Sequence, residues 1–200
     1  MHRFANPARF ARFAAAVTPW SAALTGLLFA AGLALALVAS PPDYQQGETV
    51  RIMYVHVPAA WMAMFVYAVV AAGSASALVW RHPLGDMVAR AASPVGAAFT
   101  LLALLTGSLW GKPMWGAWWV WDARLTSVLV LFFLYLGHIA LIHAFDDPAR
   151  GARAAAILTP LLVMAGAYFA YFVTVLMVRV RAELAAAKLR GLRAALLARG

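Results

Sequence analysis

The residues of this chain best suited to bind a metal are its histidines, and His56 stands apart among them. It lies in the segment M-Y-V-H-V-P, directly before a long apolar run. A neutral imidazole is the commonest metal ligand in proteins, although a lone interfacial histidine can also make one ordinary hydrogen bond. The chain has no cysteine, which excludes thiolate metal sites, disulfides and thiol chemistry. The remaining histidines are His2, His82, His138 and His143.

A cluster of tryptophans is the second unusual feature. Residues 110–124 read W-G-K-P-M-W-G-A-W-W-V-W-D-A-R and hold five of the eight tryptophans in the chain. Indole rings favour the membrane interface, so the cluster is either a belt that anchors neighbouring helices or a wide, flat surface for a planar ligand. The five are Trp110, Trp115, Trp118, Trp119 and Trp121.

Three charged residues lie within the same segment: Lys112, Asp122 and Arg124. The two cations could pair with carboxylates on the rim of a ligand, or only snorkel to the interface. Asp122 could orient an indole or imidazole N–H, and could equally cap a helix beginning near Leu125. Together with His56, this segment suits a planar apolar ligand with a metal centre.

The elements that position these residues are predicted to be membrane-spanning helices. The chain has 200 residues, of which 65% are hydrophobic and 12% charged. This composition predicts an all-α fold, a polytopic helical membrane protein with about five transmembrane helices in a single membrane domain. The expected spans are 20–39, 57–80, 91–109, 125–144 and 154–178, with a tryptophan-rich outer loop at 110–124 and a basic tail at 179–200.

The distribution of basic residues predicts the topology. The net charge is +9, but the basic residues lie at the ends of apolar runs, which indicates membrane orientation and excludes nucleic-acid binding. The basic N-terminal arm predicts a cytoplasmic N-terminus, and His56 then shares the outer side with residues 110–124. His138 lies roughly 20 Å along the fourth span and is expected to form a hydrogen bond between helices. The arm carries Arg3, Arg9 and Arg12.

The basic tail conflicts with a five-span topology. A fifth span would carry residues 179–200 outside, whereas their positive charge favours the cytoplasm. Three explanations stay open. The last run does not cross fully, the tail tolerates the outside, or an outer loop has been lost together with half of each flanking span.

Residues 110–127 resemble the tryptophan-rich WWD segment of the haem-handling proteins of cytochrome c maturation. The segments R-I-M-Y-V-H-V-P-A-A-W, S-P-V-G-A-A-F-T and H-A-F-D-D narrow the resemblance to the haem exporter protein C (CcmC) family of the bacterial System I pathway, over roughly residues 15–158. By motif match, His56 is an axial ligand of the haem iron. The residues expected to contact haem are Trp110, Lys112, Trp115, Trp118, Trp119, Trp121, Asp122 and Arg124.

The resemblance implies an inner-membrane protein whose tryptophan-rich loop is periplasmic. Such a protein binds haem b non-covalently and transiently, without turnover chemistry of its own, and passes it to a membrane-anchored haem chaperone (CcmE-like). It works beside an ABC-type ATPase and permease (CcmA-like and CcmB-like) and a small helper subunit (CcmD-like). No G-x-x-x-x-G-K-[ST] motif occurs in the chain, so ATP dependence is expected to come from a partner.

One departure from the family pattern concerns the second axial ligand. The resemblance implies six spans and a second periplasmic histidine between the last two, but no histidine follows His143. Met53, Met62 and Met114 are alternatives, as are a partner's histidine or water. Two rival functions also stay open: a structural subunit impaired in haem binding, and a haem lyase, although lyase relatives are much larger.

Overall fold

The computed structural model describes residues 7–159, 178–180, 182, 186 and 188–191, and every regular element in this part of the chain is helical. The elements are α1 (Pro7–Ala34), the π-helical turn η1 (Leu35–Ala39), α2 (Val50–Trp80), α3 (Pro83–Trp115) and α4 (Ala123–His143). Residues 148–159 are also helical. The predicted all-α class is therefore confirmed.

Four helices among the described residues are long and apolar enough to cross a membrane, judged by length and composition. They are Ala8–Ala39, Val50–Trp80, Leu84–Trp115 and Ala123–His143. The chain is thus a polytopic helical membrane protein, as the sequence predicts. Most of the predicted fifth span and basic tail, along with His2 and Arg3, lies outside the described residues.

The helices extend beyond the apolar runs from which they were predicted. α2 begins at Val50 rather than near residue 57, and α3 continues to Trp115, through the first six residues of the predicted outer loop. Hydropathy finds the hydrocarbon-spanning core, whereas backbone hydrogen bonding continues until a residue ends the helix. Gly116 ends α3 with a left-handed backbone (φ 76°), and its N–H donates to the Lys112 carbonyl. The connection to α4 is therefore residues 116–122.

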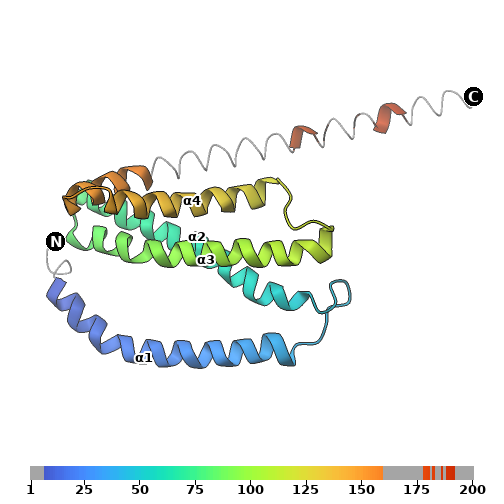
Figure 1. Cartoon of the computed structure of the whole chain (residues 1–200), viewed down its shortest axis with the longest axis horizontal. Helices are drawn as coiled ribbons and strands as arrows, with labels where there is room; N and C mark the ends of the chain where they lie inside the picture. Colours follow the sequence, from blue (N-terminus) through green and yellow to red (C-terminus); the bar gives the residue numbers. More distant parts are fainter. Residues whose placement is uncertain (1–6, 160–177, 181, 183–185, 187, 192–200) are drawn as a thin grey trace, which may run out of the picture. The chain divides into compact units, whose positions relative to one another are not determined.

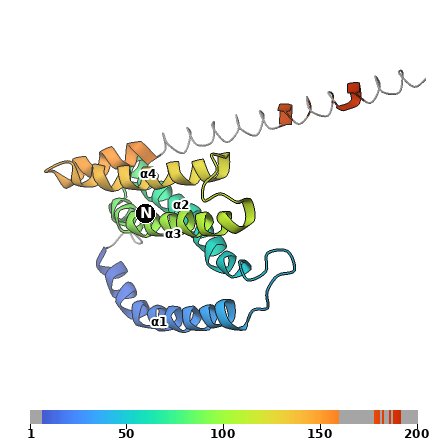
Figure 2. The ribbon, with the colours of Figure 1, turned by 45° about the vertical axis from the view of Figure 1, so that its right-hand side comes forward.

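Helices α2, α3 and α4 lie side by side (Figures 1 and 2), with the most extensive contacts between α2 and α3. Tyr135 of α4 joins all three. Its ring is completely buried, its hydroxyl donates to the Ala63 carbonyl of α2 at 2.7 Å, and it packs edge-on against Tyr67 at 5.6 Å. The ring rests where α3 has Gly96 in place of a side chain. The core thus depends on a glycine facing a tyrosine.

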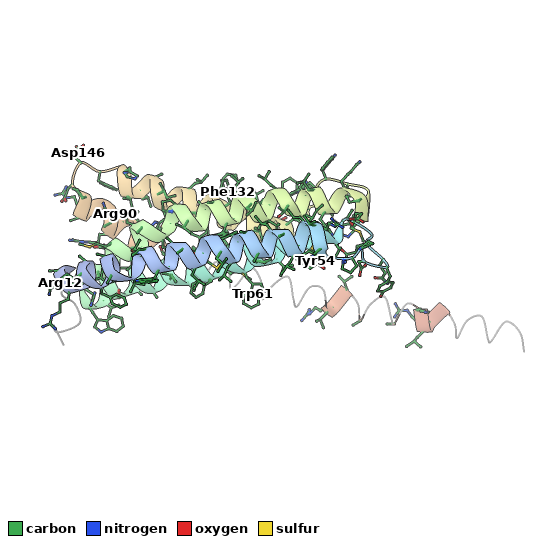
Figure 3. All side chains as sticks on the ribbon, turned by 90° about the horizontal axis from the view of Figure 1, so that it is seen from below. Arg12, Tyr54, Trp61, Arg90, Phe132 and Asp146 are labelled. Carbon is green, nitrogen blue, oxygen red and sulfur yellow. The ribbon has the colours of Figure 1, made fainter. Side chains whose placement is uncertain are left out.

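Large apolar side chains cover the outer surface of these helices. Trp61 projects away from the bundle in Figure 3, and 69% of its surface is exposed. In the same view Arg90 and Asp146 lie at one end of the bundle, and Tyr54 lies towards the other. An apolar belt with charged ends is the surface that a lipid bilayer requires.

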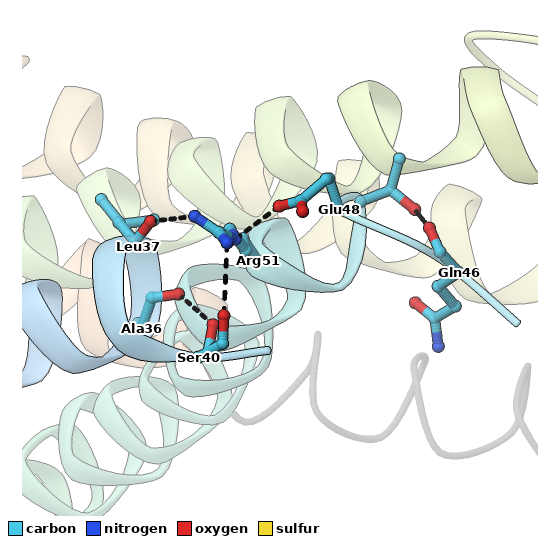
Figure 4. Close-up of polar contacts among 7 residues, drawn as sticks. Ala36, Leu37, Ser40, Gln46, Glu48 and Arg51 are labelled. Atoms are coloured by element: carbon cyan, nitrogen blue, oxygen red, sulfur yellow. Dashed lines mark hydrogen bonds and ion pairs between the residues drawn. The ribbon is translucent and has the colours of Figure 1, made fainter. Parts of the chain in front are cut away.

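The link between η1 and α2 is held by Arg51 (Figure 4). Its guanidinium donates to the carbonyls of Leu37 and Ser40, the latter at 3.2 Å, and pairs with Glu48 at 2.8 Å. These contacts join the end of the π-helical turn to the first turn of α2. Arg51 is therefore a structural residue of this link.

Candidate functional site

The candidate site lies where α2 begins, α3 ends and α4 begins. His56 lies in the second turn of α2, and the tryptophans are shared between the end of α3 and residues 116–122. The structure therefore brings the predicted histidine and the predicted aromatic residues to the same end of the helix bundle.

The half-buried His56 side chain reaches from α2 to α3. Its Nδ1 atom lies 3.0 Å from Thr106 Oγ1, and that hydroxyl is 2.7 Å from the Leu102 carbonyl of its own helix. A methyl group added at Gly107 would lie 2.9 Å from His56 Cε1, so the imidazole packs against the backbone of α3. Two consecutive residues of α3 thus fix the position of the ring.

The tryptophan rings form two edge-to-face pairs. Trp110 and Trp115 are 5.1 Å apart with an interplanar angle of 88°, and Trp119 and Trp121 are 5.6 Å apart at 75°. The predicted flat surface is therefore wrong as a description of these four rings. The quadrupole of an aromatic ring favours such T-shaped contacts over face-to-face stacking.

Residues 116–122 are tied back to the last turns of α3. Ser108 Oγ donates to the Trp118 carbonyl at 2.7 Å, and Lys112 Nζ donates to the Gly116 carbonyl at 3.1 Å. The Lys112 ammonium also lies 6.0 Å from the centre of the Trp118 ring, within range of a cation–π contact. These contacts hold Trp118 near the end of α3 while leaving 54% of its surface exposed.

Asp122 is the N-cap of α4. Its carboxylate accepts a hydrogen bond from the Leu125 N–H at 2.8 Å and pairs with Arg124 at 2.8 Å, so the helix-capping interpretation of this residue is confirmed. Partial burial acts to raise the pKa of Asp122. The Leu125 hydrogen bond and the Arg124 guanidinium outweigh it and hold the pKa below its usual value. Arg124 also lies 5.5 Å from the centre of the Trp115 ring.

Replacing Asp122 with alanine is expected to lower the free energy of unfolding by about 1 kcal/mol at neutral pH, because the cap is lost. A carboxyl group with a pKa lowered by folding stabilises the fold above its unfolded pKa of about 4 and loses this contribution as pH falls through the lower folded pKa. The difference in unfolding free energy between wild type and Asp122→Ala, measured by thermal unfolding in detergent, should therefore become smaller in acid. Asp122→Asn keeps the capping oxygen and should lose less. An alanine variant as stable as wild type at neutral pH would contradict the assignment.

Residues 40–49, which link η1 to α2, also contact this end of the bundle. The sequence analysis did not predict these contacts. Trp110 Nε1 donates to Gln46 Oε1 at 2.9 Å, and Thr49 Oγ1 lies 3.8 Å from Met114 Sδ. The Nε1 atom of Trp119 is buried and has no hydrogen-bond partner among the described residues. Thr106 was also missed, although T-G-S at 106–108 is a polar break in an apolar run.

The other described histidines lie elsewhere. His138 is buried, with 4% of its surface exposed, and its Nδ1 is 2.8 Å from Ser93 Oγ of α3, which confirms the predicted hydrogen bond between helices. His82 accepts a hydrogen bond from the Leu84 N–H and caps the start of α3. His143 is the last residue of α4. Of the histidines that the structure describes, only His56 lies at the end of the bundle that carries the tryptophans.

The fold and the site together define a class: a multi-pass helical membrane protein with one imidazole and a tryptophan cluster at the same end of its bundle. The family model of heme exporter protein C (CcmC) matches residues 1–159. The chain belongs to this family.

Curated relatives of this chain carry the same name as the family model. Heme exporter protein C of Bradyrhizobium diazoefficiens is 63% identical over 155 residues, which cover 78% of this chain and 59% of the relative. The Escherichia coli K12 protein is 49% identical over 158 residues, covering 79% and 64%. The Paracoccus denitrificans protein is 45% identical over 167 residues, covering 84% and 67%. The aligned part of the chain spans about three fifths of the first two relatives.

Proposed function

We propose that this chain binds haem at the end of the bundle that carries His56 and the tryptophans, and hands it to a membrane-anchored, CcmE-like chaperone for cytochrome c maturation. The observation that carries the proposal is an oriented imidazole at the same end of the bundle as two tryptophan pairs. The heme exporter names of the relatives support it. The chain acts as a transfer protein with no turnover chemistry of its own.

The imidazole, indole rings and cationic side chains at this end of the bundle are suited to binding haem. Haem b supplies an iron already held by four ring nitrogens, so a single imidazole such as His56 completes one axial position. The exposed rings of Trp118 and Trp121 offer apolar surface for a macrocycle, since 54% and 75% of their areas are free. Lys112 and Arg124 can pair with its carboxylates.

The distribution of charge supports one orientation of the chain in the membrane. Arg81, Arg90, Arg150 and Arg153 lie at the ends of helices away from the tryptophans, and the positive-inside rule assigns that end to the cytoplasm. The N-terminus is then cytoplasmic and the tryptophan end periplasmic, in a bacterial inner membrane. CcmA-like, CcmB-like and CcmD-like subunits are the proposed partners beside the chaperone, and ATP hydrolysis belongs to the first of them.

A haem titration of the purified chain in detergent tests the proposal. We expect a saturable Soret band, distinct from that of haem in detergent alone, and transfer of the bound haem to a purified chaperone domain. A chain that develops no Soret band with haem in excess would overturn the binding function.

A second candidate function is that of a structural subunit of the ABC-type complex, impaired in haem binding. It is motivated by residues 144–200, which contain no histidine that could serve as a second axial ligand. Co-purification of permease and ATPase with a chain that gives no Soret band would favour this function over haem delivery.

A further inference from the structure

We infer that Thr106 is a positioning residue for His56, which fixes the imidazole in the tautomer that leaves Nε2 free for iron. The inference rests on the proposed function, because it concerns the same site. It goes further by assigning a role to a residue outside the tryptophan cluster and on a different helix from the histidine.

The Thr106 hydroxyl has a single proton to donate. Oγ1 lies 2.7 Å from the Leu102 carbonyl oxygen and 3.4 Å from the Ala103 carbonyl oxygen. Carbonyl oxygens only accept hydrogen bonds, so the hydroxyl proton is committed to the backbone of α3. Towards any other neighbour, the hydroxyl oxygen can therefore only accept a hydrogen bond.

That neighbour is Nδ1 of His56, at 3.0 Å. Because the hydroxyl can only accept there, Nδ1 must carry the proton and donate it. A neutral imidazole protonated at Nδ1 has its lone pair on Nε2, which is the atom that binds a metal. Thr106 therefore selects the ligating tautomer before any iron is present.

Gly107 supplies the space for this arrangement. A Cβ atom at this position would lie 2.9 Å from Cε1, 3.5 Å from Nδ1 and 3.8 Å from Nε2 of His56. The ring thus lies against the backbone of α3 and cannot turn towards it. Thr106 therefore determines which nitrogen of His56 carries the proton, and Gly107 determines where the ring lies.

The same hydroxyl–imidazole geometry occurs at a second site in the chain, where it provides an internal comparison. Ser93 Oγ donates to the Ala89 carbonyl at 2.7 Å and lies 2.8 Å from Nδ1 of His138. His138 is buried between helices, whereas half-buried His56 lies at the tryptophan end of the bundle. Local hydrogen bonding therefore fixes both tautomers, and of these two histidines only His56 lies at the end proposed to bind haem.

The chemical consequence concerns the strength of the axial bond. A hydrogen bond donated by the far nitrogen of a metal-bound imidazole raises the basicity of the ligating nitrogen, and losing such a partner typically weakens metal binding by about 10–100-fold. Thr106→Val keeps the shape and removes the acceptor. We expect haem affinity to fall by about 10-fold or more and the iron–histidine stretching frequency of the ferrous protein to decrease. Thr106→Ser should restore both.

The experiment separates this inference from the proposed function. Resonance Raman spectra and haem titrations are compared for the full-length wild type, Thr106→Val and Thr106→Ser. A wild-type chain without a Soret band overturns the proposed function. A wild-type chain that binds haem, with a valine variant identical to it in affinity and stretching frequency, overturns only the role of Thr106.

A measurement on the haem-free wild type keeps the inference testable if the valine variant fails to fold. Nitrogen-15 spectra of histidine-labelled protein distinguish the two neutral tautomers, and the signals of His56 are assigned by their absence in His56→Gln. We expect a protonated Nδ1 and an unprotonated Nε2. A protonated Nε2 would overturn the inference without reference to any variant of Thr106.

Discussion

Replacing His56 with alanine is expected to weaken haem binding by more than about 100-fold, because it removes the ligand itself rather than a partner of the ligand. The tryptophans and cations remain in the variant, so weak apolar binding of haem should persist without the spectrum of an imidazole-bound iron. A haem titration followed by absorption spectroscopy measures both effects.

His143→Ala is the matched control. It also removes one histidine, but from the exposed last residue of α4, at the opposite end of that helix from Asp122. Its Soret band and affinity should equal those of wild type. Added imidazole should restore the axial spectrum of His56→Gly, because it refills the vacated ligand position. Unchanged affinity and spectrum in His56→Ala would show that haem binds elsewhere.

Hydropathy predicted four helices that the structure describes, because crossing a bilayer requires about 20 apolar residues in helical form. It predicted their ends less well. The last turns of α3 contain Lys112 and Pro113, which end an apolar window but do not end the helix. The end is set by Gly116, whose left-handed backbone turns the chain out of α3. A helix end depends on backbone conformation at one residue, which an average over many residues cannot detect.

The candidate site was also only partly predictable. Sequence singled out His56 and the tryptophans as candidates, because five indoles in one short segment are unusual and His56 is predicted to lie on the same side of the membrane. The partner of His56 could not be identified in this way. Thr106 lies 50 residues further along the chain, and its contact depends on the rotation of α3 against α2. The edge-to-face tryptophan pairs likewise depend on side-chain torsions that sequence order does not specify.

Substituting alanine for Gly96 is expected to destabilise the helix bundle. An added Cβ would overlap the ring and hydroxyl of Tyr135, which is fully buried and hydrogen-bonded to the Ala63 carbonyl. The ring cannot move without breaking that bond, and overpacking of this kind costs about 1–3 kcal/mol. The apparent melting temperature of the detergent-solubilised chain should fall.

Gly26→Ala is the control for the intrinsic effect of the methyl group. Among the described residues, no atom outside its own helical turn lies within 4 Å of the added Cβ. This change in α1 should therefore be neutral or stabilising, as alanine is the better helix former. The clash itself can be isolated in a double-mutant cycle with Tyr135→Ala, which removes the ring. Gly96→Ala should then cost far less than it does beside the tyrosine. Equal costs in both backgrounds would mean that Gly96 is required for some reason other than the Tyr135 ring.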